Sequence, residues 1–208
     1  MFGPMAKTAK VERSVTGTRK VEPFNRQSIE LIKRTLCARK AHRDLALFSL
    51  GIDCMLRGGD LVRLKVSDVR DPLGNMKDAI PVRQGKTGKS VKTYVSEATQ
   101  KSLAAMIKAD GKWQTDYLFA AERAPHGDHM TETTLRRLVK VWARIAHLDA
   151  SQYSSHSLRR SKAALIYAET HNIEVCRQLL GHASVAATSM YLDVKDSEVE
   201  AIARRFEV

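Results

Sequence analysis

The longest apolar stretch of the sequence, Leu45–Leu56, is interrupted mainly by Ser49 and Asp53. A helix needs about 20 apolar residues to cross a bilayer, so this stretch is too short to span one and we expect no membrane partner. It predicts instead a strongly apolar helix over residues 41–55 in a globular body, which Gly58 and Gly59 then break.

Apolar residues recur at spacings of three and four through most of the remaining chain, the pattern of amphipathic helices. Asn25 is a candidate cap for the first of them. Short alternating segments predict strands, with turns at Asp71–Asn75 and Gln84–Lys89. We expect helices over residues 26–37, 41–55, 60–64, 97–109, 131–147, 157–170, 173–180, 184–191 and 196–206, and strands over 66–69, 79–82 and 91–95. The predicted fold is mainly α with a small three-stranded antiparallel β-sheet, an α+β class.

Residues 1–22 are rich in Lys, Thr, Gly and Ser and lack periodicity, so they predict a flexible basic arm or a cloning remnant. The body, residues 23–208, is expected to form one domain. The sequence holds 35 Lys and Arg against 23 Asp and Glu, a formal net charge of +12. The arm holds five of the basic and two of the acidic residues, so the body keeps a net charge of +9. Such a body should attract polyanions, nucleic acid above all, although charge alone is also compatible with general solubility.

The cysteines Cys37, Cys54 and Cys176 lie far apart and among apolar neighbours, a pattern typical of buried reduced thiols. Residues 1–20 contain no apolar central stretch of the kind that a signal peptide needs. Both features indicate a reducing compartment, so we expect a cytoplasmic location, at the nucleoid if DNA is the partner.

Two short motifs suggest sites that the sequence does not support. The turn Gly85–Ser90 resembles a nucleotide-binding P-loop, but it lacks the earlier glycine and joins two predicted strands instead of a strand and a helix. His126 and His129 lie in a predicted loop without a third ligand at a recognisable spacing. We therefore expect neither ATP nor a metal ion at these places.

Four further segments form one constellation. They are Cys54–Leu64, with Arg57-Gly58-Gly59-Asp60-Leu61; the turn Gln84–Lys89; Ser155–Arg160, with His156 three positions before Arg159; and Leu179-Leu180-Gly181-His182, followed nine positions later by Tyr191. Each segment alone is unspecific, but together and in this order they resemble the tyrosine recombinase (phage integrase) family over residues 23–208. The resemblance implies the catalytic-domain fold of that family, double-stranded DNA as the partner, and DNA recombination or integration, an activity typical of mobile genetic elements.

The resemblance also implies how the phosphate is held. Phosphoryl transfer places negative charge on the non-bridging phosphate oxygens, and the planar guanidinium of arginine matches these oxygens with two hydrogen bonds. By the resemblance, the two clamping arginines are Arg57 and Arg159, and His182 donates to a phosphate oxygen. Asp60 corresponds to an acidic residue that supports the first arginine, although a simple ion pair at a helix start is the alternative.

The remaining roles concern protons. The resemblance makes Tyr191 the nucleophile, whose ordinary pKa of about 10 nearby cations would lower; a buried packing aromatic is the alternative. His156 would take or steer its proton. The leaving 5′ oxygen needs a proton from a lysine on the β-turn, either Lys86, which we favour, or Lys89.

Arg160, Lys89 and Arg63 are expected to contact the DNA backbone. The resemblance implies no cofactor and no metal, since cationic side chains supply the electrostatic stabilisation. It also implies self-association on DNA, with a tetramer in the synaptic complex and a monomer or weak dimer in the absence of DNA.

Two rival functions stay open. A type IB topoisomerase shares the chemistry but religates the same strand, and a catalytically silent DNA-binding module would bind without cleaving. The 22-residue arm is too short to form the helical DNA-clamping domain that precedes the catalytic domain in most members of the family.

Overall fold

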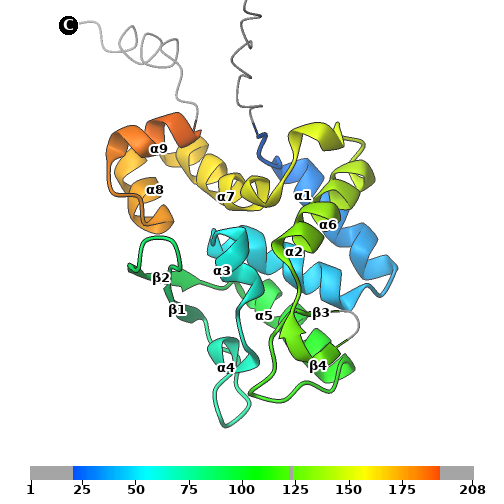
Figure 1. Ribbon diagram of the computed structural model, residues 1–208. Coiled ribbons are helices and arrows are strands. Elements are labelled where there is room, and N and C mark those ends of the chain that lie inside the picture. Colours follow the sequence, from blue (N-terminus) through cyan, green and yellow to red (C-terminus); the bar gives the residue numbers. More distant parts are fainter. Residues whose placement is uncertain (1–20, 122–123, 193–208) are drawn as a thin grey trace, which may run out of the picture.

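The computed structural model describes residues 21–121 and 124–192, which are mainly helical, as predicted (Figure 1). The helices are α1 (Arg26–Ala38), α2 (His42–Cys54), α3 (Gly58–Val62), α4 (Val66–Val69), α5 (Glu97–Ala109), α6 (Glu132–Ile145), α7 (Ser155–Thr170), α8 (Ile173–Leu180) and α9 (Val185–Leu192), with a 3₁₀ turn at Ala150–Gln152. The strands are β1 (Ala79–Arg83), β2 (Ser90–Tyr94), β3 (Ala120–Ala121) and β4 (Ala124–His129).

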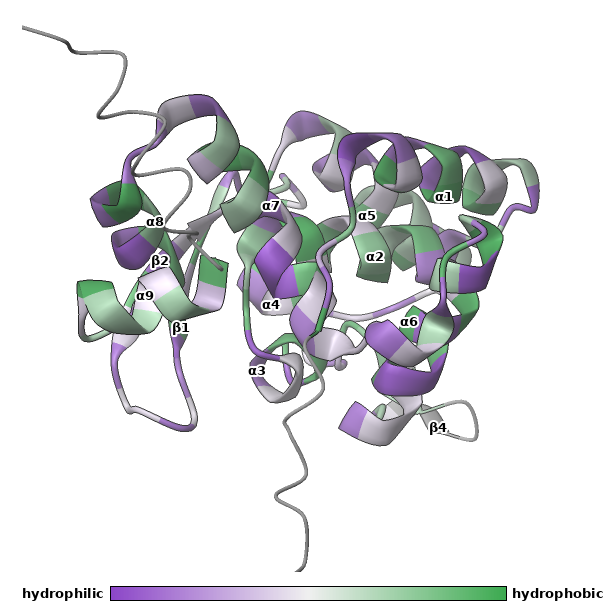
Figure 2. Cartoon of the chain, turned by 90° about the horizontal axis from the view of Figure 1, so that it is seen from above, coloured by the Kyte–Doolittle hydropathy of each residue, from purple (hydrophilic) through white to green (hydrophobic). Residues whose placement is uncertain are grey.

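Helix α2 lies at the centre of the main core and packs against α1, α5, α7 and β2. Leu47, Phe48 and Leu50 are fully buried there, and each such side chain contributes about 1.5–3 kcal/mol to folding. Figure 2 shows the apolar residues of α2 and α5 in green in the interior and hydrophilic residues in purple on the outer turns of α6. The prediction of a helix over residues 41–55 is confirmed. Within the described residues, no helix is long and apolar enough to cross a membrane.

A second, smaller apolar cluster holds the C-terminal helices. Met55, Ala163 and Leu180 are buried in it, and Tyr191 packs against them. Helices α8 and α9 pack on α7, and α8 also contacts β2, which Figure 1 shows as the hairpin below α8. The segment that carries Tyr191 is thereby placed next to the C-terminal end of α2.

The predicted three-stranded sheet is wrong, because residues 21–121 and 124–192 form two separate two-stranded sheets, β1–β2 and β3–β4. Strands β1 and β2 form the predicted antiparallel hairpin, with Ala79 opposite Tyr94 and Arg83 opposite Ser90. Residues 66–69 form helix α4 instead of a strand. The Asp68 carboxylate accepts from the Lys65 N–H at 2.7 Å at the start of this helix, and the N–H groups of Val66 and Ser67 donate to carbonyls of residues 116 and 114.

The segment around His126–His129 was predicted to be a loop, but it forms strand β4. The break of the central helix was also assigned to the wrong residues. Helix α2 ends at Cys54, and Met55 adopts the left-handed conformation with φ 50°. Gly58 and Gly59 begin α3.

Other local predictions have mixed outcomes. Asn25 caps α1, since its side chain accepts from the Ser28 N–H at 2.8 Å. Cys54 and Cys176 are buried as expected, but Cys37 is exposed, because it lies on the outer face of α1. Nearly all of the predicted arm and the whole predicted helix 196–206 lie outside the described residues.

Candidate functional site

The six candidate catalytic side chains come from separate elements that meet near the C-terminal end of α2. They are Arg57 before α3, Lys86 in the β1–β2 turn, His156 and Arg159 on α7, His182 between α8 and α9, and Tyr191 on α9. Three of them, Arg159, His182 and Tyr191, form a close group. Arg57, Lys86 and His156 line an open hollow beside this group.

Arg159 is the most deeply buried member, with 2% of its surface exposed. Its guanidinium donates to the Met55 carbonyl and, at 2.6 Å, to the Leu180 carbonyl. The left-handed Met55 therefore presents its carbonyl to this arginine, which ties the end of α2 to the end of α8. The guanidinium carbon also lies 6.0 Å from the centre of the Tyr191 ring. Arg159 thus holds the local fold together and faces the candidate nucleophile.

The hydroxyl of Tyr191 is buried and makes no hydrogen bond of ordinary geometry within the described part of the chain, although the Arg159 guanidinium lies close enough to favour its ionised form. Burial raises the pKa of Tyr191 to about 12, although Arg159, Arg160 and Arg57 act in the opposite direction. In the DNA-free chain, burial therefore outweighs the lowering by cations that the sequence led us to expect. The cluster combines a buried hydroxyl with several positive charges, and such a site favours an anion as its ligand.

His182 is held by a turn that requires glycine before it. Gly181 has φ +64°, and a Cβ there would lie 2.7 Å from Val91 Cγ1 and 3.0 Å from Gln84 Nε2. The ring of His182 packs edge-on against Tyr191, with ring centres 5.1 Å apart. Burial, with help from Arg159 and Arg57, lowers the pKa of His182 to about 4. The imidazole is therefore neutral at neutral pH before any phosphate arrives.

Arg57 is linked to the hairpin by Gln84, a residue that sequence reasoning missed. Arg57 donates through Nη1 to Gln84 Oε1, and Thr87 Oγ1 donates to the same oxygen at 2.8 Å. Gln84 is only 1% exposed, and its backbone pairs with Lys89 and Gly88 across the turn. One buried amide therefore connects Arg57, the first of the two arginines predicted to clamp the phosphate, to the turn that carries Lys86. Only its place at the start of the turn could have indicated this role.

The two candidate lysines differ in position. Lys86 lines the open hollow of about 320 Å³ together with Arg57 and His156, whereas Lys89 is exposed and does not line it. Asp60 fixes the start of this turn, because its Oδ1 accepts from the Gly85 N–H at 2.9 Å. Its other oxygen, Oδ2, is buried without a hydrogen-bond partner in the described residues, so Asp60 supports the hairpin and does not bond to Arg57. The place of Lys86 in the lining of the hollow favours Lys86 over Lys89 as the proton donor to the leaving oxygen.

His156 lies on the first turn of α7 at the edge of the same hollow. Burial and the charge of Arg159 lower its pKa, while Glu132 raises it. Glu132, at the start of α6, is a second residue that sequence reasoning missed. Gly58 makes room for it, since a Cβ at Gly58 would lie 3.0 Å from Glu132 Oε1. The additional glycine of the first motif therefore serves close packing.

The expected DNA contacts lie around this cluster. The guanidinium carbon of Arg160 is 5.2 Å from the centre of the Tyr191 ring. Arg63 is exposed and lines the hollow, and Lys89 is exposed on the hairpin turn. Their contact with DNA stays a prediction.

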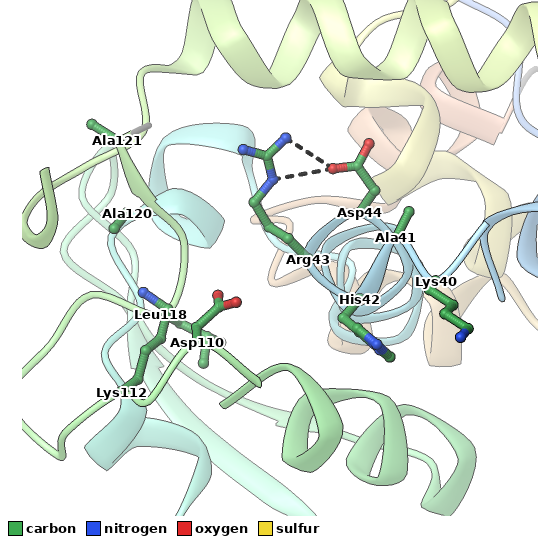
Figure 3. A pocket seen from close by; sticks show the side chains of 10 residues that line it. All are labelled: Lys40, Ala41, His42, Arg43, Asp44, Asp110, Lys112, Leu118, Ala120 and Ala121. Carbon is green, nitrogen blue, oxygen red and sulfur yellow. Dashed lines mark hydrogen bonds and ion pairs between the residues drawn. The ribbon is translucent and has the colours of Figure 1, made fainter. Parts of the chain in front are cut away.

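A larger hollow lies at the opposite end of α2, about 20 Å away by the length of that helix. It is lined by Lys40, Ala41, His42, Arg43, Asp44, Asp110, Lys112, Leu118, Ala120 and Ala121 (Figure 3). The Arg43 guanidinium is paired with Asp44 at 3.0 Å, and Lys112 donates to the Tyr117 carbonyl. Because this hollow contains none of the motif residues, we place the functional site at the other end.

Comparisons with known proteins point to one family. Residues 24–198 match the family model described as the phage integrase family. Tyrosine recombinase XerC of Caldanaerobacter subterraneus subsp. tengcongensis is 30% identical over 161 residues, covering 76% of this chain, and the chain spans 43% of that relative.

Two solved structures share the fold. The crystal structure of XerA recombinase superposes with a TM-score of 0.72 at 24% identity, covering 91% of this chain and 66% of that chain. The crystal structure of a lambda integrase dimer superposes with a TM-score of 0.64 at 19% identity, covering 87% of this chain and 50% of that chain.

Proposed function

Because the chain belongs to the phage integrase family, we propose that it breaks and rejoins DNA strands with the hydroxyl of Tyr191 as the nucleophile. The observation that carries this proposal is the placement of Tyr191. Its hydroxyl is buried without a hydrogen-bond partner among the described residues, and its ring centre lies 6.0 Å from the guanidinium carbon of Arg159. Site-specific recombination or integration of double-stranded DNA is the function that this arrangement supports best.

In the proposed reaction, Tyr191 Oη attacks a DNA phosphorus and the bond to the 5′ oxygen breaks. The products are a 3′-phosphotyrosyl link and a 5′ hydroxyl. Arg57, Arg159 and His182 hold the non-bridging oxygens, where negative charge develops. His156 takes the phenolic proton, and Lys86 gives one to the leaving oxygen. A 5′ hydroxyl of a partner duplex then reverses the attack, so that no ATP is consumed.

The experiment that tests the proposal uses a nicked suicide substrate carrying the target site. Loss of the short fragment after cleavage traps the chain on DNA, and a denaturing gel then shows a covalent adduct. Joining of strands from two duplexes indicates a recombinase, whereas relaxation of supercoiled plasmid without recombinant products indicates a type IB topoisomerase. Binding without any adduct would identify a catalytically silent DNA-binding module and contradict the proposal.

Replacing Lys86 with Ala is expected to slow cleavage far more than replacing Lys89, because only Lys86 lines the hollow at the site. A substrate with sulfur in place of the 5′ bridging oxygen should rescue Lys86→Ala, since a thiolate leaves without a proton. Initial rates on the oxygen and sulfur substrates measure this. Rescue that follows Lys89→Ala instead would transfer the role to Lys89.

We also propose that residues 23–208 form the catalytic domain of a protein that assembles on DNA as a tetramer and is monomeric or weakly associated without it. A lambda integrase dimer of this fold is described as bound to a COC′ core site, which supports DNA-bound assembly. The predicted helix over residues 196–206 is short and would bury little area between subunits, so association of the free chain should be weak.

The sequence of residues 195–206, outside the described residues, places Val199, Ile202, Ala203 and Phe206 at spacings of three and four. We propose that these residues form a helix whose apolar stripe docks into a neighbouring subunit on DNA. Deletion of residues 196–208 should therefore abolish cooperative binding to two adjacent half-sites and spare binding to a single half-site. Gel-shift titrations on one-site and two-site DNA measure this. Unfolding of the shortened chain, followed by circular dichroism, would show that the segment belongs to its own core.

A further inference from the structure

Thr188, on α9, lies against the ring of His182. Its side-chain oxygen is 3.1 Å from His182 Nδ1, and the residue is fully buried. The other ring nitrogen, Nε2, remains the one available to a ligand. Thr188 has no role in the proposed reaction.

The direction of this hydrogen bond follows from the surroundings. A buried hydroxyl must donate its single proton inside the protein. Thr188 Oγ1 has two acceptors nearby, Nδ1 of His182 at 3.1 Å and the Ser184 carbonyl at 3.3 Å. Bonds from a hydroxyl to an oxygen normally span about 2.5–3.0 Å, so the contact with Ser184 is too long to be a good one. The proton of Thr188 is therefore better placed toward the ring nitrogen.

The location of the ring proton decides what His182 can do. With a pKa of about 4, the imidazole holds a single proton at neutral pH. If that proton sat on Nδ1, a lone pair on Nε2 would face the phosphate oxygens and repel them. If it sits on Nε2, His182 donates to the phosphate without first becoming charged.

We propose that Thr188 is a positioning residue for His182: its hydroxyl donates to Nδ1 and so keeps the ring proton on Nε2, the nitrogen left to donate to a DNA phosphate. The backbone of His182 is held independently, since Arg177 Nη1 donates to its carbonyl at 2.9 Å. Helix α8 thus fixes the main chain and α9 fixes the ring. The consequence for catalysis rests on the proposed function, but the hydrogen bond itself belongs to the DNA-free chain.

Nitrogen-15 NMR of the histidine rings in the full chain, without DNA, tests this bond. The His182 signals are identified among the seven histidines by their loss in His182→Ala. In the wild type at neutral pH, we expect Nε2 to be protonated and Nδ1 to show the shift of a nitrogen that accepts a hydrogen bond. Thr188→Ser keeps the hydroxyl and should preserve both signals. The shape-matched Thr188→Val should move the Nδ1 signal to that of a free acceptor.

A wild-type spectrum with the proton on Nδ1, or a folded Thr188→Val with unchanged His182 signals, would overturn the inference. If Thr188→Val does not fold, the wild-type and Thr188→Ser spectra still decide the matter. Suicide-substrate cleavage is the second test. The initial cleavage rate of Thr188→Val should be about five- to tenfold lower than that of the wild type, which is the rate equivalent of one hydrogen bond. In a His182→Ala background, it should change nothing further. An equal loss in both backgrounds would reduce Thr188 to a packing residue, whereas supporting spectra without any wild-type adduct would refute the proposed function alone.

Discussion

Replacing Tyr191 with Phe is expected to abolish covalent attachment of the chain to DNA and to leave DNA binding nearly unchanged. The substitution removes only the nucleophilic oxygen and keeps the ring that packs against His182 and the C-terminal cluster. Because the hydroxyl is buried without a hydrogen-bond partner in the described chain, its removal should not lower the melting temperature and can raise it slightly. The suicide-substrate gel and thermal unfolding measure the two effects.

Tyr94→Phe is the matched control, since Tyr94 is an exposed tyrosine on β2. It should form the adduct at the wild-type rate. An adduct that persists in Tyr191→Phe would remove Tyr191 from the role of nucleophile. A clear fall in melting temperature would show instead that its hydroxyl is bonded in the folded chain.

Substituting either clamping arginine with Ala is expected to slow cleavage by about 10²–10³-fold, the usual cost of one preorganised donor to a developing oxyanion. The two variants should differ in stability. Arg159→Ala deprives the buried carbonyls of Met55 and Leu180 of their donor, at about 1–3 kcal/mol for each group left unsatisfied. Arg57→Ala loses one hydrogen bond, to Gln84.

Urea unfolding compares these two variants with Arg160→Ala. The neighbouring Arg160 faces the Tyr191 ring at 5.2 Å, and its removal should change the unfolding free energy little. We expect Arg159→Ala to unfold at a clearly lower urea concentration than both others. Cleavage within tenfold of the wild type in Arg57→Ala or Arg159→Ala would refute the phosphate clamp, and equal midpoints would refute the anchoring role of Arg159.

Much of the secondary structure was predictable because it depends on neighbouring residues. The expected helix over 97–109 matches α5, and the one over 173–180 matches α8, since periodicity and caps such as Ser96 and Asn172 are local properties. The prediction of a strand at residues 66–69 was wrong, because the two valines of this segment are compatible with both strand and helix periodicity. The hydrogen bonds from that segment to residues 114 and 116 are distant in sequence, and together with the Asp68 carboxylate at the start of the segment they favour the helix.

The features of the candidate site also fall into two groups, those that the sequence shows and those that depend on packing. The residue types, their order and the resemblance to the family could be read from the amino-acid sequence, because arginine, histidine, lysine and tyrosine carry their chemistry in the side chain. It could not indicate that Gln84 joins Arg57 to the hairpin, or that Gly58 makes room for Glu132, because these contacts exist only once distant segments pack together. Tertiary structure alone decided the resting state of the site. Burial keeps Tyr191 protonated despite the surrounding cations, because removing a charge from water costs more than those cations return. For His182, burial and the same cations act together and keep the imidazole neutral.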